Sequence, residues 1–261
     1  MEFFKYPRTQ HIEGSKIQKG DEDLKQVSFD FLKGNYCVLE EKVDGANTGI
    51  SFDENGKLYL QSRGHILNGG YGEKQFTLFK KWANCYQYDL YQILGDRYIM
   101  YGEWLYAKHT VFYDALTHYF MEFDIYDKKK NIFLSTKKRQ ELLRNCPYIV
   151  SVLILYEGSL SSLKQLESFL ENSHFKSKNW RESLEKACKK LNMNEEVVKK
   201  QTDNSDSMEG IYIKIEDEEK VIERLKYVRG SFLNTILNSE THWKDRPILP
   251  NQLKEGITIF P

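Results

Sequence analysis

Apolar and polar residues alternate along the chain in patterns that predict strands near both ends and helices between them. Residues 35–62 predict a β-hairpin, because β-rich runs flank the turn signal Asp-Glu-Asn-Gly. Residues 75–93 carry apolar side chains near helical spacing and predict a helix. Residues 97–106 and 117–127 are rich in Tyr, Phe and Ile, and they predict two further strands.

The pattern becomes helical between about residues 136 and 205. Two stripes at helical spacing predict core-facing helix sides; they comprise Leu160, Leu163, Leu166 and Leu170, then Trp180, Leu184, Ala187 and Leu191. Residues 209–216 and 220–229 predict a second hairpin around an acidic turn. The order strands, helices, strands predicts an α+β domain over residues 1–230 with a helical insert, followed by a short tail at 231–261.

The composition narrows the classes of protein. The 261 residues include 38 Lys+Arg and 38 Asp+Glu, and this balance argues against binding nucleic acid through overall charge, although a local basic groove stays open. No apolar run approaches the ~18 residues that span a membrane, and the N-terminus lacks the apolar stretch of a signal peptide. The four cysteines lie far apart, which favours reduced thiols and a cytoplasmic protein.

Lys42 is the first candidate catalytic residue. It lies in the segment Glu-Glu-Lys-Val-Asp-Gly-Ala-Asn, where a predicted strand ends and an Asp-Gly turn follows. A neutral lysine there can act as a nucleophile, but a free lysine titrates near 10.4. Neutrality at pH 7 therefore costs roughly 4–5 kcal/mol unless neighbouring cations or a metal lower the pKa. The alternative interpretation is an ordinary Asp-Gly turn.

Three more segments carry residues that suit a nucleotide site, and each also has a purely structural interpretation. Arg63 follows the returning strand, where it either clamps a phosphate or is simply exposed. Glu103 lies in an apolar run and needs a partner, either a ribose hydroxyl or a cation. Strand alternation predicts that Phe120 shares a face with Glu122 and Asp124, where its ring either stacks on a base or packs in the core.

The second hairpin carries several charges. Arg224 and Lys226 are two residues apart, so a regular strand points both the same way, as expected if an anion lies between them. Glu209 and Lys214 are five apart, so either Glu209 precedes the strand or Gly210 introduces a bulge. Exposed charges on an ordinary hairpin are the alternative.

Six motifs occur in a fixed order between residues 36 and 229: K-x-D-G, S-R-G, G-E-W, F-D-I-Y-D, E-G-I-Y-I-K and R-L-K. The series resembles the covalent nucleotidyltransferases, which comprise RNA ligases, DNA ligases and mRNA capping enzymes. The chain is most similar to the RNA ligase 2 type, which includes double-strand RNA ligases and RNA-editing ligases. Asn47 stands five residues after Lys42, where DNA ligases and capping enzymes usually place Arg.

The resemblance implies an ATP-grasp-like adenylation domain of antiparallel sheets flanked by helices. It also implies no OB domain, because only 35 residues follow Lys226. Lys42 would attack the α-phosphate of ATP, and Lys214 and Lys226 would bracket that phosphate and lower the pKa of Lys42. Arg224 stands where the family often has lysine, so it would act on the cofactor only through its charge.

The remaining implied roles concern the nucleotide, the metal and the nucleic-acid end. The residues are Glu41 at the adenine edge, Phe120 stacked on the adenine, Glu103 at the ribose, Asn47 and Arg63 at the sugar–phosphate or a nucleic-acid end, and Glu209 at Mg²⁺ or Mn²⁺. The implied reaction passes AMP from ATP to Lys42 and then to a 5′-phosphate RNA end, which a 3′-hydroxyl attacks. RNA ends, nicked duplex RNA among them, are the implied partners, and a kinase or phosphatase would heal the ends first.

Two other functions remain open on the residues alone. A DNA ligase-like enzyme would seal nicked DNA, but Asn47 and the short tail count against it. A non-catalytic module would only bind nucleic-acid ends, but the intact set of charged motif residues counts against that.

Overall fold

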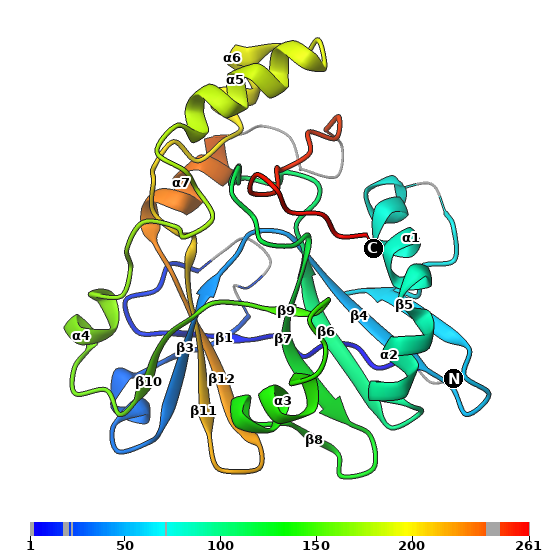
Figure 1. Ribbon diagram of the computed structural model, residues 1–261. Coiled ribbons are helices and arrows are strands. Elements are labelled where there is room, and N and C mark those ends of the chain that lie inside the picture. Colours follow the sequence, from blue (N-terminus) through cyan, green and yellow to red (C-terminus); the bar gives the residue numbers. More distant parts are fainter. Residues whose placement is uncertain (1–2, 18–20, 22, 71, 239–245, 261) are drawn as a thin grey trace.

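Two six-stranded sheets lie against each other in the part of the chain that this computed structural model describes, which is residues 3–260 without 18–20, 22, 71 and 239–245 (Figure 1). The first sheet has the order β10-β3-β11-β12-β1-β2. Its strands are β1 (Gln10–Ile12), β2 (Gln26–Val27), β3 (Cys37–Lys42), β10 (Ile154–Gly158), β11 (Gly210–Glu216) and β12 (Val221–Val228).

The second sheet has the order β5-β4-β6-β7-β8, and β9 pairs with β7 outside this path. Its strands are β4 (Ala46–Phe52), β5 (Leu58–Ser62), β6 (Tyr98–Trp104), β7 (Phe120–Asp127), β8 (Ile132–Phe133) and β9 (Val150–Ser151). Most pairings are antiparallel, which confirms the expected α+β architecture of antiparallel sheets flanked by helices.

The predicted hairpin at residues 35–62 is only half correct. β4 and β5 pair as expected, but β3 pairs with β10 and β11 in the other sheet. Residues 43–45 therefore carry the chain from one sheet to the other. Gly45 is required there, because a Cβ atom would lie 2.7 Å from the carbonyl oxygen of Trp104. This crossover places Lys42 at the junction of the two sheets.

Helices cover the outer faces of both sheets. The helical elements are η1 (Phe29–Leu32), η2 (Lys74–Phe76), α1 (Thr77–Cys85), α2 (Gln87–Leu94), α3 (Thr136–Leu143), α4 (Leu163–Glu167), α5 (Trp180–Lys190), α6 (Glu195–Lys200) and α7 (Gly230–Asn238). The expected helix at 75–93 is present as α1 and α2, whose buried side chains join the core of the second sheet. Leu166 of α4 packs in the core of the first sheet. No helix in the described ranges has the length and apolar content to cross a membrane.

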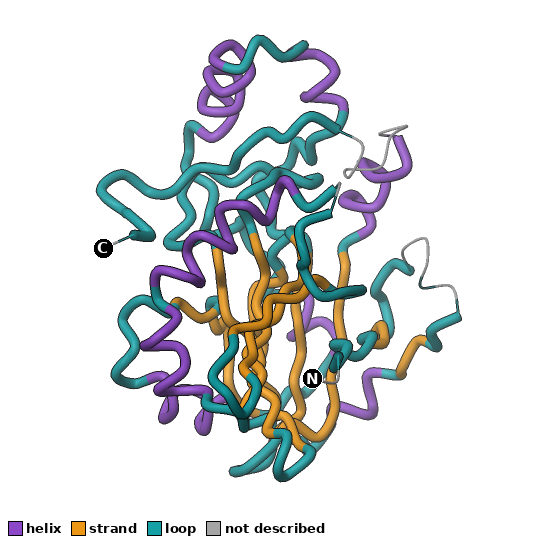
Figure 2. The backbone as a smooth tube through the Cα atoms, turned by 90° about the vertical axis from the view of Figure 1, so that its right-hand side faces the viewer, coloured by secondary structure: helices purple, strands orange, loops and turns teal. Residues whose placement is uncertain are grey.

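The segment predicted as a helical insert, about residues 136–205, also contains strands. β9 and the beginning of β10 lie in the apolar run 149–156, which is rich in Ile, Val and Leu, and β10 becomes the edge strand beside β3. The stripe on α5 is confirmed as core-facing, since Trp180 and Leu184 are buried. Figures 1 and 2 show α5 and α6 standing together at one end of the two sheets.

The last described segment packs on the loop between β6 and β7. Asn251 is buried, accepts a hydrogen bond from the backbone N–H of Tyr113 at 3.0 Å and donates one to the carbonyl oxygen of Leu105 at 2.7 Å. Ala107 pairs with Pro250 in an isolated bridge. Residues 246–260 therefore belong to the same packed unit as the sheets.

Candidate active site

Lys42 ends β3 and meets a carboxylate from the neighbouring strand. Its Nζ donates a hydrogen bond to Glu209 Oε1 at 2.6 Å, and its side chain is 24% exposed. Glu209 directly precedes β11, where Gly210 lies opposite Lys42 in register. Glycine is required at this position, because a Cβ atom would lie 2.0 Å from the carbonyl oxygen of Tyr227. Of the two arrangements that the sequence left open, Glu209 before the strand is therefore the correct one.

The electrostatics of this pair differ from the sequence-based expectation. Burial alone would lower the pKa of Lys42, but the attraction of Glu209 outweighs it, so the pKa of Lys42 is raised. The prediction that neighbouring lysines lower this pKa is wrong in this structure, where carboxyl groups dominate the surroundings of Lys42. Burial raises the pKa of Glu209 to about 7 and that of Glu103 to about 8. Lys42 is thus held as an ammonium ion by its contact with Glu209.

Two acidic side chains fix the turn that follows Lys42 by accepting hydrogen bonds from backbone N–H groups. Asp44 accepts hydrogen bonds from the backbone N–H groups of Thr110 at 2.6 Å and Val111 at 2.7 Å. Glu103 Oε1 accepts one from the backbone N–H of Gly45 at 3.1 Å. The loop after β6 therefore fixes the position of the Lys42 turn on one side of the site.

Asn47 lies opposite Glu103 in the pairing of β4 with β6. Its Oδ1 atom is buried and has no hydrogen-bond partner among the described residues. A buried acceptor of this kind is costly unless a ligand donates to it. Asn47 Oδ1 therefore has acceptor capacity left for a ligand that donates a hydrogen bond.

Lys226 of β12 lies on the same side of the first sheet as Lys42 and contacts Asp21. Asp21 also accepts a hydrogen bond from Arg8 at 2.9 Å, and His11 Nε2 lies 3.4 Å from it. Burial and the charge of Lys42 lower the pKa of Lys226, against the effect of Asp21. The pKa of Asp21 is about 2, because hydrogen bonds from Lys226 and Arg8 outweigh its burial.

Sequence reasoning missed His11 and Asp21. The strand that brings them in, β1, has three residues and pairs in parallel with β12, so that His11 lies opposite Lys226. No motif or periodicity marks so short a strand.

Lys214 and Arg224 do not join Lys42. Lys214 is fully buried; its Nζ lies 2.9 Å from Glu40 Oε1 and 3.3 Å from Asp124 Oδ1, and also contacts the carbonyl oxygen of Phe123. Arg224 Nε donates to Asp124 Oδ2 at 2.9 Å. Lys214 lies opposite Val38 in register, four residues along β3 from Lys42.

Arg139 of α3 extends this group of charges. It donates to Glu40 and to Glu122, each at 2.8 Å. We call Glu40, Glu122, Asp124, Arg139, Lys214 and Arg224 the buried ion network. The predicted bracket of a phosphate by Lys214 and Lys226 is therefore absent from this structure, and Arg224 secures Asp124 instead of facing the cofactor site.

Phe120 is also placed differently from the prediction. It is fully buried, with its ring centroid 5.2 Å from that of Trp82 and 5.6 Å from that of Phe79, beneath the outer helices. A register shift in the β6–β7 pairing leaves Phe123 without a partner and breaks strict alternation. Phe120 and Asp124 consequently face opposite sides of the sheet. The stacking role of Phe120 on adenine is corrected to a core role.

Glu41 and Arg63 lie apart from Lys42 as well. Glu41 points to the other face of β3, where it accepts hydrogen bonds from Ser173 Oγ at 2.6 Å and from the backbone N–H of His174 at 3.2 Å. Arg63 is exposed in the loop after β5. Neither contacts the Lys42–Glu209 pair in this structure.

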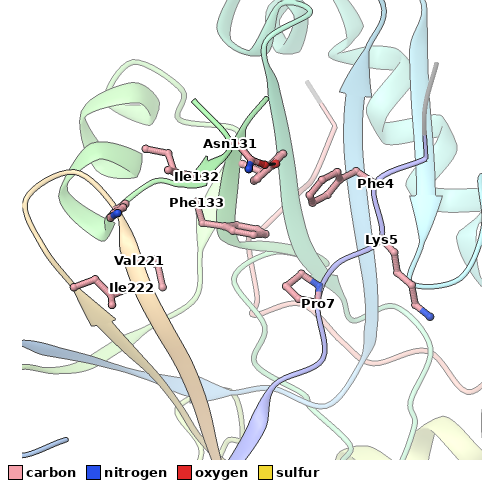
Figure 3. Close-up of a pocket in the computed structure, with 10 residues that line it drawn as sticks. Phe4, Lys5, Pro7, Asn131, Ile132, Phe133, Val221 and Ile222 are labelled. Carbon is pink, nitrogen blue, oxygen red and sulfur yellow. Dashed lines mark hydrogen bonds between the residues drawn. The ribbon is translucent and has the colours of Figure 1, made fainter. Parts of the chain in front are cut away.

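An apolar pocket of about 450 Å³ lies at the opposite end of the sheets (Figure 3). Phe4, Pro7, Ile132 and Phe133 line it together with the beginning of β12, whereas Lys226 lies near the end of that strand. No carboxylate lines this pocket. The pocket therefore lacks the acidic group that a metal would need and that Glu209 provides beside Lys42, so we place the candidate active site at Lys42.

Comparisons with known proteins identify a family and similar folds. A family model described as RNA ligase matches residues 35–228. A Naegleria gruberi RNA ligase mutant with ATP and Mn is 16% identical with a TM-score of 0.51, and the match covers 83% of this chain and 54% of that chain. The same ligase with PPi is 16% identical with a TM-score of 0.51, and the match covers 78% of this chain and 52% of that one.

The chain thus spans about half the length of the solved structures that it resembles. At this identity the likeness concerns the fold, and no curated protein matches the chain by sequence. The family model, however, covers most of the chain, from just before β3 to the end of β12. The chain therefore belongs to the RNA ligase family.

Proposed function

We propose that the protein is an ATP-dependent RNA ligase that joins 3′-hydroxyl and 5′-phosphate ends through an adenylate on Lys42. The Lys42–Glu209 pair carries the proposal, because it places a partly exposed lysine beside a carboxylate inside the region that the family model matches. Asp44, Glu103 and Lys226 surround this pair from three other elements.

In the first step, the Lys42 ammonium group loses one proton to become a neutral amine. Its Nζ then forms a bond to the α-phosphorus of ATP while the bond to the β-phosphate oxygen breaks and pyrophosphate leaves, and Nζ loses a second proton to solvent. AMP then passes to the 5′-phosphate of RNA, and attack by the 3′-hydroxyl releases AMP. Lys226 supplies positive charge and the fixed position of Lys42 supplies orientation, and such effects account for most of the catalysis of phosphoryl transfer. Loss of the Glu209 contact lowers the pKa of Lys42 and prepares it for attack.

The residues fit a divalent ion that is shared with the substrate. No group of three His, Cys, Asp or Glu side chains suited to a metal occurs in the described part of the chain. Mg²⁺ commonly binds through one or two carboxylates together with substrate phosphates, and Glu209 is the carboxylate nearest Lys42. The ion, Mg²⁺ or Mn²⁺, would supply neutralisation of phosphate charge.

We further propose the RNA ligase 2 type, nicked duplex RNA as one substrate, and a healing kinase or phosphatase as a partner. Asn47 supports the type, since its buried Oδ1 beside Glu103 suits a hydroxyl donor. A cytoplasmic location is supported by the four free cysteines.

The decisive experiment is the intact mass of the protein before and after incubation with ATP and Mg²⁺. We expect an AMP adduct on the wild type that is absent from Lys42→Ala. The adduct is then presented with matched nicks in RNA and in DNA. Sealing of DNA alone would show a DNA ligase, and a folded protein that never forms the adduct would overturn the proposal and favour an end-binding module.

A further inference from the structure

We propose that His11 and Asp21 are positioning residues for Lys226 in the reaction at Lys42, and this inference rests on the proposed function. Both residues precede the region that the family model matches, which begins at residue 35. They reach the site through β1, which pairs in parallel with β12 and places His11 opposite Lys226. Because side chains of paired residues share a face of the sheet, the imidazole lies on the same side as the Lys226 ammonium group.

The contacts of His11 form a closed chain with β12. Ser15 Oγ accepts a hydrogen bond from the backbone N–H of Val228 at 2.9 Å and lies 2.7 Å from His11 Nδ1. On the other side of the ring, Nε2 lies 3.4 Å from Asp21 Oδ2, and the same oxygen contacts the Lys226 ammonium group. The chain of contacts therefore joins the backbone of β12 at one end to the side chain of Lys226 at the other.

The charges around the imidazole determine its tautomer. Burial, followed by the charge of Lys226, lowers the pKa of His11, so the ring is neutral at pH 7 and carries one proton. The pKa of Asp21 is about 2, so its ionised carboxylate only accepts hydrogen bonds. The proton therefore lies on Nε2, which faces Asp21, and Nδ1 accepts from the hydroxyl group of Ser15. Both nitrogens of this fully buried ring thus have a partner.

Asp21 in turn fixes the Lys226 ammonium group. Arg8 donates to Asp21 Oδ1 at 2.9 Å. His11 and Lys226 both approach Oδ2, so each carboxylate oxygen has a partner and the orientation of the group is set. Among the described residues Lys226 Nζ contacts Asp21 alone, which leaves two of its three hydrogens for a phosphate. Such positions matter, because a displacement of about 1 Å can lower a rate about a hundredfold.

The first test compares two substitutions that divide the contacts of the imidazole. His11→Gln has an amide nitrogen near the position of Nε2 and keeps a donor to Asp21. His11→Asn keeps only an acceptor near Nδ1 for Ser15. The measurements are the rate of AMP-adduct formation at saturating ATP, KM for ATP, and urea unfolding. We expect His11→Gln to stay within about threefold of the wild-type rate and His11→Asn to lose about tenfold or more, with a smaller change in KM.

A merely structural role of His11 predicts a different result, in which both variants lose activity only as far as they lose stability. That result would refute the positioning role, and so would two folded variants whose rates stay within about twofold of wild type.

Asp21→Asn provides the test if the His11 variants do not fold, because it keeps the shape of the side chain and removes its charge. We expect a loss of about tenfold or more in the rate. Asp23→Asn is the matched control, because the exposed carboxylate of Asp23 also accepts from Arg8, at 2.7 Å, and has no described contact with Lys226. It should keep the wild-type rate. A wild-type rate in Asp21→Asn, or an equal loss in Asp23→Asn, would refute the role of Asp21.

Labelling of Lys226 separates failure of this inference from failure of the proposed function. Burial lowers the pKa of Lys226, and the hydrogen bond to Asp21 opposes this shift. An amine-directed reagent should therefore label Lys226 at lower pH in Asp21→Asn and in His11→Asn than in wild type, but not in Asp23→Asn. Absence of the adduct in wild type would overturn the proposed function. An unchanged labelling profile in Asp21→Asn and His11→Asn would overturn the positioning of Lys226, with or without the adduct.

Discussion

Replacing Lys214 by methionine tests whether this lysine holds the fold or performs chemistry. Its ammonium group is fully buried and lies 2.9 Å from Glu40 and 3.3 Å from Asp124. Replacing it by methionine removes one cationic partner from each of these two buried carboxylates. Breaking a buried ion pair typically costs about 3–5 kcal/mol. Arg139 stays with Glu40 and Arg224 stays with Asp124, so we expect a loss near the lower end, about 3 kcal/mol.

Urea unfolding at two pH values measures this loss. Without Lys214 the pKa of Glu40, which burial already raises, rises further, so protonation relieves the unpaired charge. The deficit of Lys214→Met should therefore be larger at pH 8 than at pH 5.

Lys226→Met is the matched control, because Asp21 keeps its contact with Arg8 at 2.9 Å and the loss of stability should be smaller. This control variant should nevertheless lose the AMP adduct. A Lys214→Met protein as stable as wild type at pH 8, but without the adduct, would refute the assignment of Lys214 to the buried ion network.

Three further changes test the rest of the site. Phe120→Ala should lower the free energy of unfolding by about 3–5 kcal/mol, whereas Phe120→Leu should keep KM for ATP within about twofold, and a large rise in KM would restore a stacking role. The pKa of Glu103 is about 8 in the folded protein and 4.5 in the unfolded chain, so the stability contributed by this group falls as pH rises between these values. The Tm of Glu103→Gln, measured from pH 5 to 9, should therefore fall less than the Tm of wild type. Glu209→Gln removes the charge that raises the pKa of Lys42, so an amine-directed reagent should label Lys42 at lower pH than in wild type. Mass spectrometry measures this labelling, and an unchanged pH profile would contradict the Lys42–Glu209 pairing.

Sequence reasoning predicted the local features of the fold well. The structure confirms the helices at 75–93, the strand around Glu103 and the hairpin of β11 and β12. These elements are predictable because alternation and helical spacing depend only on residues close in the sequence. It also selected Lys42 and Glu209, which the structure brings to 2.6 Å although they are far apart in the chain. Here the motifs supplied long-range information that periodicity lacks.

The errors share a physical cause, which is pairing that the local pattern does not encode. The irregular register at Phe123 turns Phe120 toward the core, and nothing in an alternating strand marks where such an extra residue falls. The parallel pairing of β1 with β12 brings His11 to Lys226 across more than two hundred residues. Such contacts depend on which strands become neighbours, and therefore on the whole fold.

The two lysines of the second hairpin show why residue type alone does not assign a role. Lys214 and Lys226 both face the interior between the sheets. Lys214 is surrounded by three acceptors, which are Glu40, Asp124 and the carbonyl oxygen of Phe123. Lys226 contacts Asp21 and lies near the point where the chain crosses between the sheets. A charge sealed in a low-dielectric interior is stable only with fixed partners, so its displacement is costly. A charge that takes part in phosphoryl transfer has to exchange one partner for another during the reaction. Depth along β11 and β12 therefore distinguishes the two lysines, and it supports Lys226 over Lys214 as the cation of the proposed reaction at Lys42.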